Sequence, residues 1–136
     1  MQVCGVDPAH VDMVWPLARG FILAAMRRGL DEYYDEGDIR AFCAGGAAQL
    51  WLACAEERVE AAIVSRILVY PKRRVCQIPL IGGRRMREWL PAMQAMIEDH
   101  ARANGCSHLE GSGRFGWRRA AGFEEIGPIL MKELTR

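Results

Sequence analysis

The sequence predicts an α/β (α+β) fold, in which a mixed, mostly antiparallel central sheet carries helices on both faces within a single domain, residues 1–136. Three observations lead to this fold class. Three apolar stretches follow one another with only short polar turns between them, which is typical of an antiparallel meander. These stretches are apolar at nearly every position, so we expect both faces of the sheet to be covered. An amphipathic helix then separates the meander from a further strand, which indicates at least one parallel pair.

The first part of the chain predicts a short strand and two helices. Residues 1–6 alternate weakly and suit a strand, and Asp7 and Pro8 then suit the cap and first position of a helix. Pro16 lies inside this helix and is expected to kink or split it. A second short helix is predicted over 37–44. The apolar stripe of the first helix consists of Val11, Val14, Trp15, Ala18, Phe21, Ile22 and Ala25.

The middle of the chain predicts the meander. Its strands are expected over 48–55, 59–69 and 74–81, because each of these stretches is apolar and is bounded by polar turn residues. Trp51 lies in the first of these strands, and Trp15 and Trp89 lie in apolar helical patterns, so we expect all three indole rings to pack in the core.

The last third of the chain predicts the parallel pair and two further elements. A helix is expected over about 86–104, followed by a strand over 106–110. A short helix over 114–121 and a final strand region over 123–134 complete the order.

Charge and composition exclude several classes of protein. The net charge is +1, which gives no overall attraction to nucleic acid or to a membrane surface. No apolar run approaches the roughly 18 residues that a membrane span needs. The first ten residues lack a basic region followed by an apolar stretch, which argues against a secretion signal.

The cysteines indicate a reduced compartment. Their number is odd and no CxxC pair occurs, so we expect mostly buried thiols in a cytoplasmic protein. No histidine stands at ligand spacing from a cysteine, so no metal site is predicted. The five cysteines are Cys4, Cys43, Cys54, Cys76 and Cys106.

Two local stretches accompany this order of elements. IEDHARANGCSHLEG (97–111) reads as the end of a long helix that runs into a strand, and WRRAAGFEE (117–125) as a short helix that ends in Gly-Phe-Glu. Together with the order of elements, they resemble the GNAT acetyltransferase superfamily along essentially the whole chain. IGGRRMREWL and GRFGWRRAAGFEE also resemble small GNAT-like proteins of tailed bacteriophages and prophages.

The resemblance implies an acetyl-CoA site at the start of the long helix. GNAT enzymes place a glycine-rich loop there, because backbone N–H groups must approach a pyrophosphate closely. Counted back from Asn104-Gly105, the loop glycines fall at Met86, Glu88 and Leu90, none of which is glycine. The nearest substitute, residues 81–85, is either a shortened cofactor loop or only a turn at the end of a strand. The candidate cofactor-binding residues are Ile81, Gly82, Gly83, Arg84, Arg85, Arg87 and Arg118.

The catalytic groups implied by the resemblance are incomplete. Many GNAT enzymes protonate the leaving thiolate with a tyrosine at the position that Arg118 occupies here, and no tyrosine follows Tyr70. Glu60 and Glu110 stand in predicted strands where a general base can lie. The alternative for each is an exposed strand carboxylate.

The sequence therefore leaves two functions open, and it does not decide whether the protein is an enzyme. One is an acetyl-CoA-dependent N-acyltransferase with a degenerate site that acts on an amine. The other is an inactive GNAT-like binding or structural module, phage- or prophage-encoded and virion-associated or directed at the host. An arginine cluster suits CoA phosphates, another anion or an acidic protein partner, or else forms a solvated face. Its members are Arg84, Arg85, Arg87, Arg114, Arg118 and Arg119.

Overall fold

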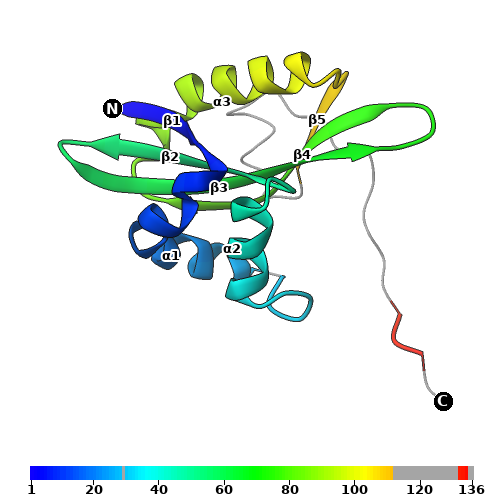
Figure 1. The fold of residues 1–136 in the computed structure, drawn as a ribbon, viewed down its shortest axis with the longest axis horizontal. Coiled ribbons are helices and arrows are strands. Elements are labelled where there is room, and N and C mark those ends of the chain that lie inside the picture. The colour runs from blue at the N-terminus through cyan, green and yellow to red at the C-terminus, as the bar shows by residue number, and fades with distance from the viewer. Residues whose placement is uncertain (29, 112–131, 135–136) are drawn as a thin grey trace.

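A computed structural model describes residues 1–28, 30–111 and 132–134 of the chain (Figure 1). The helix predicted over 114–121 and nearly all of the strand predicted over 123–134 lie outside these residues. None of the helices in the described ranges is long and apolar enough to cross a membrane. In chain order the elements are β1 (Gln2–Val6), a short 3-10 helix (Pro8–His10), α1 (Val11–Met26), α2 (Glu36–Ala44), β2 (Gln49–Ala55), β3 (Arg58–Val69), β4 (Arg74–Gly83), α3 (Met86–Ala103) and β5 (His108–Gly111).

The five strands form one sheet in the order β1-β2-β3-β4-β5. The first four strands pair antiparallel, and β5 runs parallel to β4, which confirms the predicted mixed sheet. This parallel pairing extends only from Val75, opposite His108, to Ile78, opposite Gly111. Within the described residues, the second half of β4 therefore has no strand on its outer side.

A β-bulge lies where this unpaired half of β4 begins. Val64 of β3 stands opposite Leu80 of β4, but Arg66 stands opposite Gln77, so two residues of β4 face a single residue of β3. One of the two is Pro79, which has no N–H to donate to a sheet ladder. A bulge is one of the few places in a sheet that tolerates proline.

Helices cover both faces of the sheet, as predicted. In Figure 1, α3 lies along one face, while α1 and α2 lie along the other. Two cores result: one contains Trp15 and Ile22 of α1 with Leu50 of β2, and the other contains Trp89 of α3 with Ile63 of β3. This arrangement explains why the middle strands are apolar at successive positions.

The three tryptophans predicted in the core are buried there. Each indole N–H donates one hydrogen bond: Trp15 Nε1 to Glu36 Oε1 at 2.8 Å, Trp51 Nε1 to Ser65 Oγ at 2.9 Å, and Trp89 Nε1 to the carbonyl oxygen of Arg84 at 2.7 Å. A buried indole N–H without a partner is costly, so these bonds fix where each ring can sit.

The first helical region begins as predicted, but it is not split at Pro16. The Asp7 carboxylate accepts a hydrogen bond from the backbone N–H of Ala9 at 2.9 Å, and Pro8 occupies the first turn. The change from 3-10 to α geometry comes at Val11, and α1 then continues through Pro16. Trp15, directly before the proline, and Ala18, two residues after it, are buried in the core, and this packing holds the helix across the missing hydrogen bond.

Candidate functional site

The loop between β4 and α3 is shorter than the family resemblance implies. It consists of residues 84 and 85, because β4 ends at Gly83 and α3 begins at Met86. The positions counted as loop glycines, Met86, Glu88 and Leu90, therefore lie in the first turns of α3, and Leu90 is only 7% exposed in the core. That these three positions replace the loop glycines of the resembled family stays a prediction.

Gly82 and Gly83 have no room for a side chain, because neighbouring parts of the protein fill the space that a Cβ would need. A Cβ at Gly82 would lie 2.1 Å from the carbonyl oxygen of Phe21 in α1. A Cβ at Gly83 would lie 2.4 Å from the Cβ of Ala61 in β3. Neither glycine opens a cradle for a phosphate, because both pair with β3 at the close-packed end of β4.

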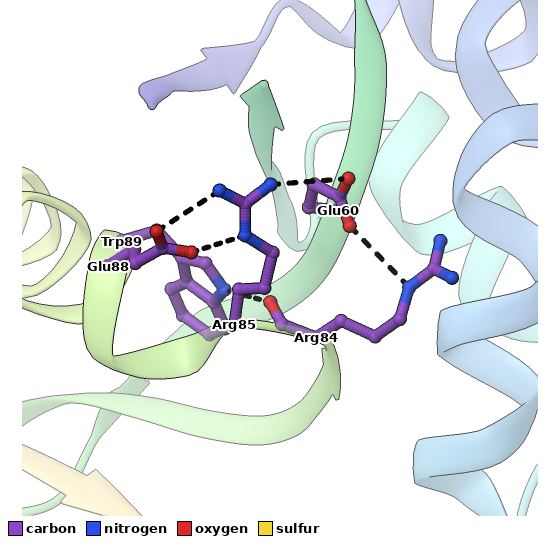
Figure 2. Close-up of polar contacts among 5 residues, drawn as sticks. All are labelled: Glu60, Arg84, Arg85, Glu88 and Trp89. Carbon is purple, nitrogen blue, oxygen red and sulfur yellow. Dashed lines mark hydrogen bonds and ion pairs between the residues drawn. The ribbon is translucent and has the colours of Figure 1, made fainter. Parts of the chain in front are cut away.

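The two arginines of the loop meet a buried carboxylate. Glu60, near the start of β3, has a side chain that is 9% exposed, and its carboxylate lies 3.5 Å from Arg84 Nε and 3.9 Å from Arg85 Nη1 (Figure 2). The expectation of an exposed strand carboxylate is therefore wrong for Glu60. A carboxylate removed from water needs positive partners, and the loop supplies two.

Arg85 also pairs with the first turn of α3. Its Nε and Nη2 donate to the two carboxylate oxygens of Glu88, the latter at 3.1 Å (Figure 2). This contact lowers the pKa of Glu88 and raises that of Arg85, because each charge favours the other. Arg85 caps the helix in the left-handed region, at φ 60° and ψ 38°, a conformation that non-glycine residues rarely adopt.

The other predicted base belongs to a separate polar cluster on β3, β4 and β5. Glu110 accepts a hydrogen bond from Gln77 Nε2 at 2.9 Å and one from the Tyr70 hydroxyl at 3.3 Å. Gln77 Oε1 in turn accepts from Arg66 Nε at 2.6 Å. Partial burial and then the Glu110 carboxylate raise the pKa of Tyr70.

Glu60 and Glu110 stand at different ends of the sheet. Glu110 lies opposite Gln77, whereas Ala61, next to Glu60, lies opposite Gly83. Six residues of β4 separate these positions, which is about 20 Å at ~3.3 Å per residue. The two carboxylates therefore cannot act on the same atom.

A hollow lies between α3 and the outer half of the sheet, beside the unpaired part of β4. Its lining is apolar apart from Gln94, and it includes the candidate Ile81. Within the described residues, the unpaired edge of β4 runs from the bulge at Pro79 to Gly83, just before the loop. Its lining residues are Ile63, Ile78, Ile81, Leu90, Met93, Gln94, Ile97 and Leu109.

Of the other arginines predicted to bind an anion, the structure describes only Arg87. Arg87 is exposed in the first turn of α3. Arg114, Arg118 and Arg119 lie outside the described residues, so the arginine cluster is seen only in its first half. The sequence analysis did not predict a role for Gln77 or Arg66. Each is a polar residue among the apolar residues of a strand, Arg66 in β3 and Gln77 in β4, and this pattern could have indicated them.

Comparisons with known proteins agree with this geometry at the level of the fold. No family model and no curated protein matches the sequence. Among solved structures, a predicted acetyltransferase from Clostridium acetobutylicum with acetyl-CoA superposes with a TM-score of 0.71 at 11% identity, over 97% of this chain and 95% of that one. A ribosomal-protein-alanine N-acetyltransferase from Brucella melitensis gives 0.67 at 13%, over 98% and 100%. An aminoglycoside 6'-N-acetyltransferase from Acinetobacter haemolyticus gives 0.66 at 14%, over 100% and 99%. The predicted GNAT-like fold is confirmed.

Proposed function

We propose that this chain, which has the fold of these acetyltransferases, is an N-acyltransferase that uses acetyl-CoA to acylate an amine. One observation carries the proposal: the outer edge of β4 is unpaired, within the described residues, from the bulge at Pro79 to the loop at Arg84. A free strand edge offers backbone N–H and C=O groups to an extended ligand that contains amides. The pantetheine arm of CoA is such a ligand.

The residues along this edge suit the arm better than they suit the diphosphate of CoA. The side chains that line the hollow beside this edge, Ile81 among them, are apolar apart from Gln94, so they offer no positive charge to a diphosphate. At the loop, Arg84 and Arg85 face Glu60 and Glu88. With the exposed Arg87 in the next turn, these five side chains leave a net charge of +1 (three positive minus two negative). Since Gly82 and Gly83 give no cradle, anion binding rests on arginine side chains.

The reacting end of the site is expected at the bulge, beside the cluster of Glu110. Bound acetyl-CoA supplies an activated thioester there. We assign to Glu110 the role of accepting the proton that an amine loses on acylation, and Gln77 donates a hydrogen bond to this carboxylate. Positioned general bases of this kind contribute about 10²–10⁴-fold to a rate.

Binding and catalysis can be tested separately. Acetyl-CoA at ~100 times its Kd should stabilise the fold by about 2.7 kcal/mol, seen as a rise in Tm. No rise at millimolar acetyl-CoA would refute the proposal. Glu110→Gln should keep that rise and lower kcat/KM by about 100-fold, measured as release of the CoA thiol with a panel of primary amines. Glu57→Gln, at the exposed turn between β2 and β3, is the matched control and should change neither quantity.

A second function is favoured by the pairing of the loop arginines with Glu60 and Glu88, which leaves fewer cations for a cofactor. It is an inactive GNAT-like module that binds an acidic protein, on a phage virion or in the cytoplasm of a host. A stoichiometric acidic partner, lost in an Arg84→Ala variant, together with no acetyl-CoA response, would support this function over the first. The surface would comprise Arg84, Arg85, Arg114, Arg118 and Arg119.

A further inference from the structure

Helix α1 is apolar on its outward side as well as on the side that packs against the sheet. Its inner side contacts β3 and β4, and α2 lies along one flank (Figure 1). From position 13 to position 24 its only charged residue is Arg19, which pairs with Glu36 of α2. The exposed residues that share the outward side, called the outer face of α1 below, are Met13, Pro16, Leu17, Gly20 and Ala24.

Nothing in the described part of the chain covers this outer face. Met13 is 71% exposed and Leu17 is 60% exposed. No atom lies within 4 Å of the place where a Cβ of Gly20 would stand. A surface helix normally carries polar residues on the side that faces water, and a helix that is apolar all round is normally buried. We therefore expect a partner to cover the outer face of α1.

The two ends of α1 carry opposite charges. Asp12 stands in the first turn and remains largely exposed, although its Oδ1 accepts a hydrogen bond from Arg40 of α2 at 2.7 Å. Arg27 and Arg28 directly follow the last residue of the helix, and both are exposed. Neither guanidinium has an ion-pair partner among the described residues. The apolar outer face therefore lies between an acidic end and a basic end.

We propose that a second copy of this chain docks on the outer face of α1, with the two helices antiparallel about a two-fold axis. Such an axis sets a surface against itself, so the surface must be complementary to itself. With the axis at the middle of the outer face, Leu17 of each copy lies opposite Gly20 of the other, a large residue against a small one. The basic end of each helix then lies beside the acidic end of the other, whereas a parallel pair would set like charges together. This inference goes beyond the proposed function and does not depend on it.

The size of the outer face predicts a weak dimer. A helix of 16 residues is about 24 Å long at ~1.5 Å per residue. One pair of such helices buries less than the ~1,200–2,000 Å² of a stable interface. We therefore expect a Kd between about 1 μM and 1 mM. Sedimentation velocity of the full chain across this range of concentration should show the mass rise from that of one chain toward that of two.

Leu17→Glu tests the apolar part of the interface. It should weaken the dimer about 100-fold, because each copy brings one carboxylate into the middle of the contact. Glutamate is a good helix former and the position is exposed, so the variant should keep the circular dichroism spectrum of the wild type. The Tm of the wild type should rise with protein concentration, and that of Leu17→Glu should not. Val69→Glu is the matched control: Val69 is 69% exposed at the end of β3, away from α1, and this variant should dimerise as the wild type does.

Reversing the charges at the two ends tests the antiparallel arrangement. One variant carries Arg27→Glu with Arg28→Glu, and the other carries Asp12→Lys, which should still fold because the exposed ion pair with Arg40 contributes little to stability. Alone, each variant sets like charges together at both ends of the dimer. Mixed in equal amounts, the two variants restore opposite charges at both ends, so the mixed dimer should be about 10-fold tighter than either homodimer. This gain should fade in about 1 M salt.

Three outcomes would overturn the inference. The first is a wild type that stays monomeric up to about 1 mM. In that case another protein, a membrane surface or the part of the chain outside the described residues covers the outer face. The second is a dimer that Leu17→Glu leaves intact. The third is a pair of charge variants that associate no more tightly when mixed than alone. None of these measurements uses acetyl-CoA, so the proposed function stands or falls separately.

Discussion

Gly82→Ala is the sharpest test of why the glycines before the loop are glycines. The new Cβ would stand 2.1 Å from the carbonyl oxygen of Phe21 and 2.8 Å from its carbonyl carbon, whereas real Cβ contacts essentially never fall below 3.0 Å. The obstacle is backbone and cannot rotate away, so β4 and α1 must move apart by about 1 Å and loosen the core between them. Overpacking of this kind costs roughly 1–3 kcal/mol, and we expect the upper end.

For a domain of this size, ~3 kcal/mol corresponds to a Tm lower by about 12 °C. Differential scanning calorimetry without any ligand measures this loss. Gly20→Ala is the matched control: it lies inside α1 with no atom within 4 Å of its added Cβ, and it should stabilise by ~0.5–1 kcal/mol. Phe21→Leu should not rescue Gly82→Ala, since the clash is with the main chain. If Gly82→Ala kept the wild-type Tm and lost only CoA affinity, Gly82 would be a ligand cradle and the packing argument would be refuted.

Two further predictions concern titratable groups. Glu36→Gln weakens the acceptor of the hydrogen bond that the Trp15 indole N–H donates. This hydrogen bond lowers the pKa of Glu36 below its ordinary value of 4.5. The stability that the hydrogen bond contributes is therefore present above pH 4.5 and is lost as the pH falls through the lowered pKa. Urea unfolding should therefore show a free energy of unfolding about 1 kcal/mol lower for the variant at pH 7, and this difference should shrink as the pH falls below 4.5. A difference independent of pH would contradict this origin. Burial raises the pKa of the Cys43 and Cys76 thiols to about 11. A maleimide at pH 7.5 should therefore label the exposed Cys4 and leave Cys43 and Cys76 unmodified until the chain unfolds. Peptide mapping of the labelled protein measures this difference.

The fold was predictable because its signals are local. Asp7-Pro8 marks the start of a helix by chemistry that involves only its own turn. The apolar strands at 49–55 and 58–69 indicate a sheet covered on both sides, as their burial confirms. Pro16 shows the limit of local rules, because packing around Trp15 outweighs one missing hydrogen bond.

The candidate site was only partly predictable, because its parts are distant in the chain. The sequence by itself determined the order of the elements as far as residue 111, the end of a strand at Gly82-Gly83 and the presence of two arginines before the long helix. Only the tertiary structure decided that Phe21 fills the space above Gly82, that Glu60 is buried beneath Arg84, and that Glu110 lies far from Glu60. The physical reason is that periodicity and capping act over a few residues, whereas steric exclusion and ion pairing depend on which surfaces meet once the sheet and helices have packed.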